Sequence, residues 1–149
     1  MNEPIVAYRM WPLDGHHICS LRYKMPWTPG CIMTSDVIPL THYSNGIHAF
    51  RNGYYALQYC TEFTFDYVIG EVYLWGKIVE HEFGYRAEFA YPKRIEFIFK
   101  AYNCYDDKIK TIENNLCNSY GCDVDDLTTT KAKLPFRGEG SLWKPANLI

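Results

Sequence analysis

One segment constrains the fold more than any other. Residues 70–92 read GEVYLWGKIVEHEFGYRAEFAYP, in which apolar and polar side chains alternate on either side of Phe83-Gly84. Successive side chains of a β-strand point to opposite faces, and Gly84 tolerates the positive φ of a tight turn. The pattern predicts a β-hairpin whose first strand is Val68–Glu82 and whose turn is Phe83-Gly84.

The predicted hairpin has one apolar face, which we expect to cover a hydrophobic core. Register is strongly specified where one face of a strand pair is buried. In the register that matches the two strands, Ile78 lies opposite Phe89 and His81 lies opposite Arg86. The apolar face then consists of Val72, Leu74, Ile78 and Phe89.

The opposite face combines aromatic and charged side chains and is the candidate ligand-binding surface. Aromatic rings stack on planar ligands, and lysine or arginine meets negative charge. A solvated sheet face is the competing interpretation, because cross-strand ion pairs add only about 0.2–1 kcal/mol each and are common. The candidate ligand-binding residues are Tyr73, Trp75, Lys77, His81, Arg86 and Glu88.

The same surface offers one arrangement for catalysis. His81 with Glu71 or Glu88 as its orienting carboxylate would form the general base of a hydrolase or transferase. A surface histidine beside an arginine is more common, so we expect a protein without catalytic activity. Alternation separates His81 from Glu80 and Glu82, and neither a metal ion nor a cofactor is predicted.

The cysteines and the terminus indicate the compartment. Six cysteines occur at positions 19, 31, 60, 104, 117 and 122, without a C-x-x-C pair or a zinc-finger spacing. The N-terminal sequence lacks the apolar stretch of a signal peptide, and no run approaches the ~20 apolar residues of a membrane span. We therefore expect a cytoplasmic protein with reduced thiols and no membrane partner.

Length and pattern predict one domain of the α+β class. The 149 residues contain 17% aromatic side chains, which favour strands. Ala7–Leu13 and Ile18–Tyr23 are predicted strands, Lys24–Asn45 is a long irregular connection, and a helix ends at Tyr120 before a capping glycine. We expect a curled, mostly antiparallel sheet or a small PUA-like β-barrel with one or two packed helices.

The domain is expected to span residues 1–127, followed by an extended C-terminal arm over residues 128–149. The arm is polar and contains four glycine or proline residues, with apolar side chains that are able to anchor it. The net charge of −2 lacks the basic footprint of a general double-stranded nucleic-acid binder. Recognition of a single nucleotide by stacking remains compatible with this charge.

Three blocks of the chain resemble an uncharacterised family of small bacterial and phage proteins. The blocks are GIHAF at Gly46–Phe50, the segment at residues 70–92, and a W-x-P-G element at Trp27–Gly30. The resemblance covers roughly Tyr8 to Tyr120 and implies no established activity. Members often carry Cys-x-Cys just before the Gly-Ile pair, where this chain has Tyr43 and Asn45. A metal site shared with these relatives is therefore not expected.

These observations lead to a functional prediction. The chain is expected to be a small cytosolic, non-catalytic binding protein for a nucleotide-like ligand or a protein partner, with a role in phage or host defence or counter-defence. One alternative is the hydrolase or transferase built on His81. The other is an oligomeric interaction module, such as a homodimer, that acts through its aromatic surface and its C-terminal arm.

Overall fold

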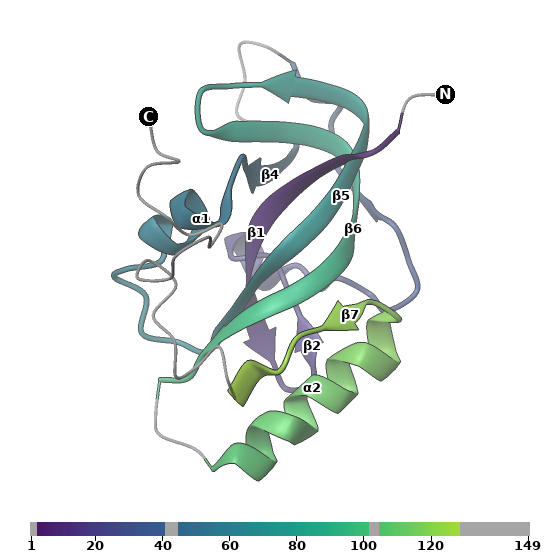
Figure 1. Ribbon diagram of the computed structural model, residues 1–149. Helices are drawn as coiled ribbons and strands as arrows, with labels where there is room; N and C mark the ends of the chain where they lie inside the picture. The colour runs from purple at the N-terminus through teal and green to yellow at the C-terminus, as the bar shows by residue number, and fades with distance from the viewer. Residues whose placement is uncertain (1–2, 41–44, 102–104, 129–149) are drawn as a thin grey trace.

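The computed structural model describes residues 3–40, 45–101 and 105–128. It has a mixed α+β fold with a mostly antiparallel, curled sheet, as predicted (Figure 1). The predicted C-terminal arm lies outside the described residues, apart from its first residue. The strands are β1 (Ile5–Asp14), β2 (His17–Ile18), β3 (Met33–Thr34), β4 (Ile47–Phe50), β5 (Tyr67–Glu80), β6 (Gly84–Phe99) and β7 (Asp123–Val124). The helices are α1 (Gly53–Tyr59), α2 (Asp106–Tyr120) and the short 3₁₀ helix η1 (Arg22–Lys24).

Four strands pair in a circuit that curls the sheet. β1 pairs with β5 along Ile5–Pro12, β5 pairs with β6, β6 pairs with β4, and β4 returns to β1 where Phe50 lies opposite Tyr8. All of these pairs are antiparallel, and β7 adds a short parallel pair to β6. The predicted strand Ile18–Tyr23 is wrong beyond Ile18, because the chain turns there into η1.

The predicted hairpin is present as β5 and β6, but its predicted register is wrong. Ile78 lies opposite Ala87 and Val79 lies opposite Arg86. The turn sets the pairing of these two residues, and a β-bulge between Trp75 and Ile78, in which Gly76 has φ of 80°, shifts the pairing again beyond them. The turn is also longer than predicted, because β5 ends at Glu80 and β6 begins at Gly84.

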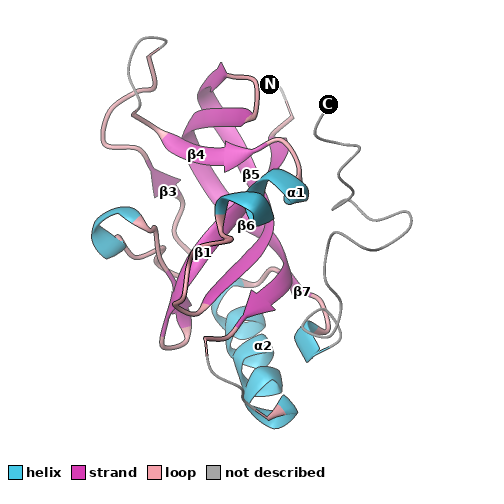
Figure 2. Ribbon diagram, turned by 90° about the vertical axis from the view of Figure 1, so that its left-hand side faces the viewer, coloured by secondary structure: helices cyan, strands magenta, loops and turns pink. Residues whose placement is uncertain are grey.

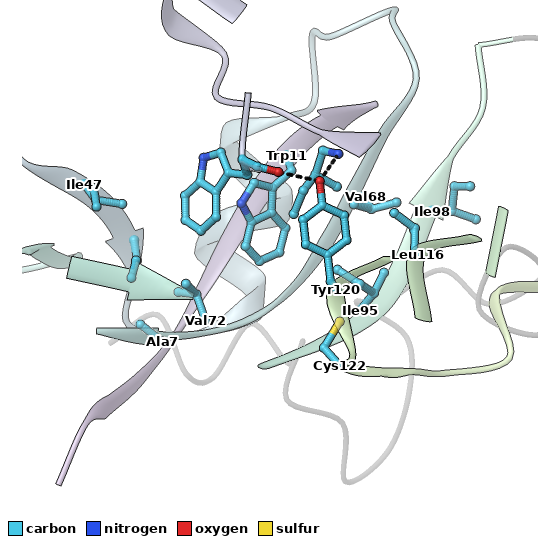
Figure 3. Packing of buried hydrophobic residues seen from close by; sticks show 14 of the residues in the cluster. Ala7, Trp11, Ile47, Val68, Val72, Ile95, Ile98, Leu116, Tyr120 and Cys122 are labelled. Carbon is cyan, nitrogen blue, oxygen red and sulfur yellow. Dashed lines mark hydrogen bonds between the residues drawn. The ribbon is translucent and has the colours of Figure 1, made fainter. Parts of the chain in front are cut away.

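The larger hydrophobic core joins buried residues of β1, β4, β5 and β6 to α2, and α2 lies at the end of the sheet away from the hairpin tip (Figures 1 and 2). The helix buries Ile109, Leu116 and Tyr120, which fits the 3.6-residue period of its apolar stripe. The Tyr120 hydroxyl donates to the Trp27 carbonyl at 2.6 Å and accepts from the Ile18 N–H at 3.0 Å (Figure 3). These two bonds attach the end of the helix to the chain around β2.

A second cluster lies under α1. The Asn52 side chain accepts from the Tyr55 N–H at 3.0 Å and thereby caps this helix. Ala56 is fully buried and faces aromatic and aliphatic side chains of the sheet. The cluster consists of Tyr8, Met10, Ala56, Cys60, Tyr67, Ile69 and Phe97. Neither α1 nor α2 has the length and apolar character that a membrane crossing would need, and the same holds for any other helix in the described part of the chain.

Candidate functional site

An open hollow of about 770 Å³ lies beside β1, between the position where β1 pairs with β4 and the position where it pairs with β2. β4 reaches β1 at Tyr8, and β2 joins β1 only at Leu13. Between these two pairs, β1 presents Arg9 and Met10 to the hollow. The other walls are the chain from β2 to β3, the segment after β3, β4 and the end of α1. This volume falls in the range of small-molecule pockets, about 300–1,000 Å³.

Arg9 is one of the two arginines among the described residues that line this hollow. One terminal nitrogen of its guanidinium donates to the His48 carbonyl, and the other donates to the Ser20 hydroxyl at 3.1 Å. Its guanidinium carbon lies 5.1 Å from the ring centroid of Trp27, a cation–π distance. The Trp27 indole N–H donates to the same Ser20 oxygen at 2.8 Å. These contacts hold the guanidinium in one position.

The partners of Arg9 are all neutral. No ion pair joins it to a carboxylate within the described residues, and its Nε is buried without a hydrogen-bond partner. Burial lowers the pKa of Arg9 to about 10, so the side chain still carries its charge at neutral pH. The hollow also contains Arg22, and Asp36 is the single carboxylate among the described residues that line it. The local charge is therefore positive in a protein whose net charge is −2.

His48 lies on the wall of the hollow next to Arg9. The residue is exposed, but neighbouring atoms partly desolvate its ring and lower its pKa first, and the positive charges of Arg9 and Arg86 lower it further. The imidazole is therefore neutral at pH 7 and has one donor and one acceptor nitrogen. Protonation at lower pH would add a second positive charge beside Arg9.

The remaining wall of the hollow is mostly apolar. Three methionines contribute to it, and methionine side chains adapt to ligands of varied shape. Two aromatic rings of the wall, Phe50 and Tyr59, lie 5.4 Å apart. The apolar residues are Met10, Leu21, Met25, Met33, Val37, Ile47, Phe50 and Tyr59. The arrangement suits a ligand that has an anionic group attached to an apolar body.

The structure places Arg86 in the protein interior. The expectation that this side chain lies on a solvent-facing surface is wrong, because only 3% of the residue is exposed. Its guanidinium donates to the Leu40 carbonyl at 2.8 Å and to the Asn45 carbonyl and side-chain oxygen at 2.7 and 3.1 Å. Its Nε donates to His81 Nε2 at 3.3 Å. Arg86 therefore attaches the segment before β4 to the hairpin.

Other residues of the predicted ligand-binding face stay near the surface. Tyr73 is 36% exposed, and Trp75 is half-buried with its ring 5.9 Å from that of Phe89. Lys77 is exposed, and its backbone N–H donates to the Glu88 carboxylate at 3.1 Å. None of the six predicted residues lines the hollow.

The structure does not bring together the groups of the predicted catalytic pair. Glu71 forms an ion pair with Lys93 at 3.3 Å, and Glu88 accepts the hydrogen bond from Lys77. His81 contacts Arg86 instead, and its pKa is lowered by burial and by that positive charge. Among residues 3–40, 45–101 and 105–128, no group of three or more histidine, cysteine or acidic side chains is placed to hold a metal ion.

Two features of the sequence indicate the hollow, although they are less conspicuous than the hairpin pattern. Arg9 is a single charge within the apolar run AYRMW of β1. A charge inside an apolar strand calls for a partner or a function, since burying it unpaired is costly. The long irregular connection Lys24–Asn45 was the second signal, because loops of this length are often functional. Pairing of β1 with β4 then joins residues almost forty positions apart.

The comparisons with known proteins found no match. No family model matches the chain, and the same result holds for curated proteins and for solved structures. The resemblance to small bacterial and phage proteins therefore stays a prediction, and the site is argued from its own geometry.

Proposed function

We propose that this protein is a non-catalytic binding protein that captures an anionic group in the hollow, with Arg9 as its principal contact. The observation that carries the proposal is a fixed, charged guanidinium in an open hollow without a carboxylate partner. A phosphate or carboxylate would find spare N–H donors there, and arginine binds such oxyanions well.

The ligand would carry an apolar or planar portion beside its anionic group. Phe50 and Tyr59 offer aromatic contact, and the methionines offer an adaptable apolar wall. Both ligand classes predicted from the sequence, a nucleotide-like molecule and a segment of a protein partner, meet this description. We expect binding to take place in the cytoplasm, and a role in phage or host defence or counter-defence is our working hypothesis.

The electrostatics of the two nearby histidines support binding rather than catalysis. His48 lies next to Arg9, and His81 accepts a hydrogen bond from Arg86. Positive neighbours lower the pKa of an imidazole, whereas a general base is usually oriented and made more basic by a carboxylate.

Isothermal titration of the full chain with sulfate and with adenosine monophosphate tests the proposal. Arg9→Met keeps much of the side-chain length and removes the charge, so we expect affinity for both anions to fall by about tenfold or more. Lys77→Met is the matched control, since it removes an exposed cation outside the hollow. Equal binding by Arg9→Met and the unaltered protein, or loss of binding in Lys77→Met, would overturn the assignment of the site.

A further inference from the structure

The exposed aliphatic side chains of this protein are concentrated beside the hollow. Twelve large hydrophobic residues are exposed within the described residues, and six of them fall in residues 21–40. Outside that segment Val6 is the single exposed aliphatic residue of the set, and the others are aromatic. The six are Leu21, Met25, Ile32, Val37, Ile38 and Leu40, with exposed fractions from 38% to 57%. We call this set the aliphatic rim.

The aliphatic rim is continuous with the hollow. Leu21, Met25 and Val37 belong to the rim and also line the hollow. Ile32 and Ile38 are the chain neighbours of the lining residues Met33 and Val37. A ligand that sits on Arg9 and extends outward would therefore meet the rim.

The segment that carries the rim is attached to the domain at several points along its length. The backbone N–H of Trp27 donates to the Ile18 carbonyl at 3.0 Å, and β3 pairs with the middle of β6 (Figure 2). The Ser35 N–H donates to the Glu88 carbonyl at 2.8 Å, and Arg86 holds the Leu40 carbonyl. A surface that is ordered before binding loses less conformational entropy when a partner docks.

Charge complementarity selects the occupant of this surface. Arg9 and Arg22 line the hollow, and Asp36 is the one carboxylate among the described residues of its lining. Exposed apolar patches on a soluble protein mark docking surfaces, and a cationic floor favours an anionic partner. Small free anions would use the floor and leave the aliphatic rim uncovered.

We infer that the hollow and the aliphatic rim together dock an acidic, aliphatic-bearing segment of a partner protein. This inference rests on the proposed function, because the acidic side chain of the partner would occupy the anion position on Arg9. The aliphatic side chains of the same segment would cover the rim and the methionines of the hollow. Ile32, Ile38 and Leu40 are rim residues outside the hollow that such a segment would cover.

Fluorescence anisotropy with synthetic peptides of about ten residues tests the inference on the full chain. One labelled pool alternates aspartate or glutamate with leucine, isoleucine or valine. A second pool replaces the acids with lysine, and a third keeps the acids and replaces the aliphatic residues with serine. We expect the first pool to bind about tenfold more tightly than either of the other two.

Two variants separate this inference from the proposed function. The triple variant Ile32→Ser, Ile38→Ser and Leu40→Ser alters exposed side chains that do not line the hollow, so it should fold, lose affinity for the first pool and still bind sulfate. Arg9→Met should lose affinity for both the first peptide pool and sulfate. If sulfate binds through Arg9 but the protein binds the first and third peptide pools with equal affinity, the inference is overturned and the proposed function stands. Failure of both ligands to bind would overturn both.

Self-association is the remaining outcome to distinguish. Sedimentation velocity of the unaltered protein and of the triple variant reports whether a second copy covers the rim. We expect both to sediment as the same species without peptide. A dimer that the triple variant dissociates would overturn the inference and assign the rim to a second copy of the chain.

Discussion

Two arginines of the sheet, Arg86 on β6 and Arg9 on β1, differ in how the fold uses their charge. Both lack a carboxylate partner within the described residues. Arg86 is 3% exposed and makes four hydrogen bonds to Leu40, Asn45 and His81. Arg9 is partly exposed, makes two hydrogen bonds and opens onto a hollow of about 770 Å³.

The difference shows which cation has a structural role and which is available for a ligand. A buried guanidinium directed at carbonyl oxygens stabilises the segment that carries them. A guanidinium with spare donors at an open surface has capacity for a further oxyanion. Gly46 connects the two regions, because it lines the hollow and a Cβ at this position would lie 3.2 Å from the Cβ of Arg86.

The largest effect on stability is expected for Arg86→Ala. The change leaves the carbonyls of Leu40 and Asn45 without their charged donor, and it should lower the free energy of unfolding by about 2–4 kcal/mol. Urea denaturation of Arg86→Ala and Arg9→Met measures the comparison directly. A larger loss of stability in Arg9→Met would reverse the roles that we give to the two arginines.

A smaller loss of stability is expected for Gly46→Ala. Gly46 has φ of 104°, and a Cβ there would come within 2.8 Å of Pro39 Cγ. Backbone strain of this kind costs about 1–3 kcal/mol, and the change would also disturb the packing of Arg86 against Gly46, which lines the hollow. Thermal denaturation with and without sulfate checks both effects. An unchanged melting temperature would show that the two regions are not connected through this residue.

Sulfate binding should depend on pH through His48. Its folded-state pKa lies below the unfolded value of 6.5, so its contribution to stability is present above 6.5 and is lost as pH falls through the folded pKa. A protonated His48 adds positive charge beside Arg9, and sulfate affinity should therefore rise severalfold as pH falls below 6.5. Sulfate keeps its charge over this range.

The pH effect has a matched control in the second histidine. Titration of His48→Gln should show a flat pH profile, and His81→Gln should keep the profile of the unaltered protein because His81 does not line the hollow. A flat profile for His81→Gln and an unchanged profile for His48→Gln would mean that the anion binds near Arg86 rather than near Arg9.

The smallest effect is expected for Tyr73→Ala on the hairpin face. Tyr73 is 36% exposed and does not line the hollow, so stability should change by less than about 1 kcal/mol and sulfate affinity should not change. Isothermal titration and urea denaturation measure the two quantities. Loss of sulfate binding in this variant would return the site to the hairpin face.

Local patterns predicted the main elements of the fold. The alternating residues of the hairpin and the helical period of Ile109, Leu116 and Tyr120 are both visible over short stretches of chain. The register was not predictable by counting, because the turn is longer than two residues and the bulge at Gly76 then adds a residue to one strand. Alternation alone also did not show that Arg86 is buried, which follows from the chain before β4 packing against the hairpin.

The hollow was harder to predict than the hairpin. It is formed by residues that are distant in the sequence, such as Arg9, Ser20 and His48, and these meet only when β4 pairs with β1 and β6. Each of the three residues is unremarkable by itself. The apolar surroundings of Arg9 were the one local indication that its charge has a specific use.

The most direct test of the central claim is an NMR titration that follows the Nε–Hε resonance of Arg9 while sulfate is added. We predict a saturable shift of this resonance, accompanied by shifts of the Ser20 and His48 amides, and no comparable shift for Arg86. A linear, unsaturated response spread over surface lysines, or a saturable shift at Arg86 with none at Arg9, would contradict the account.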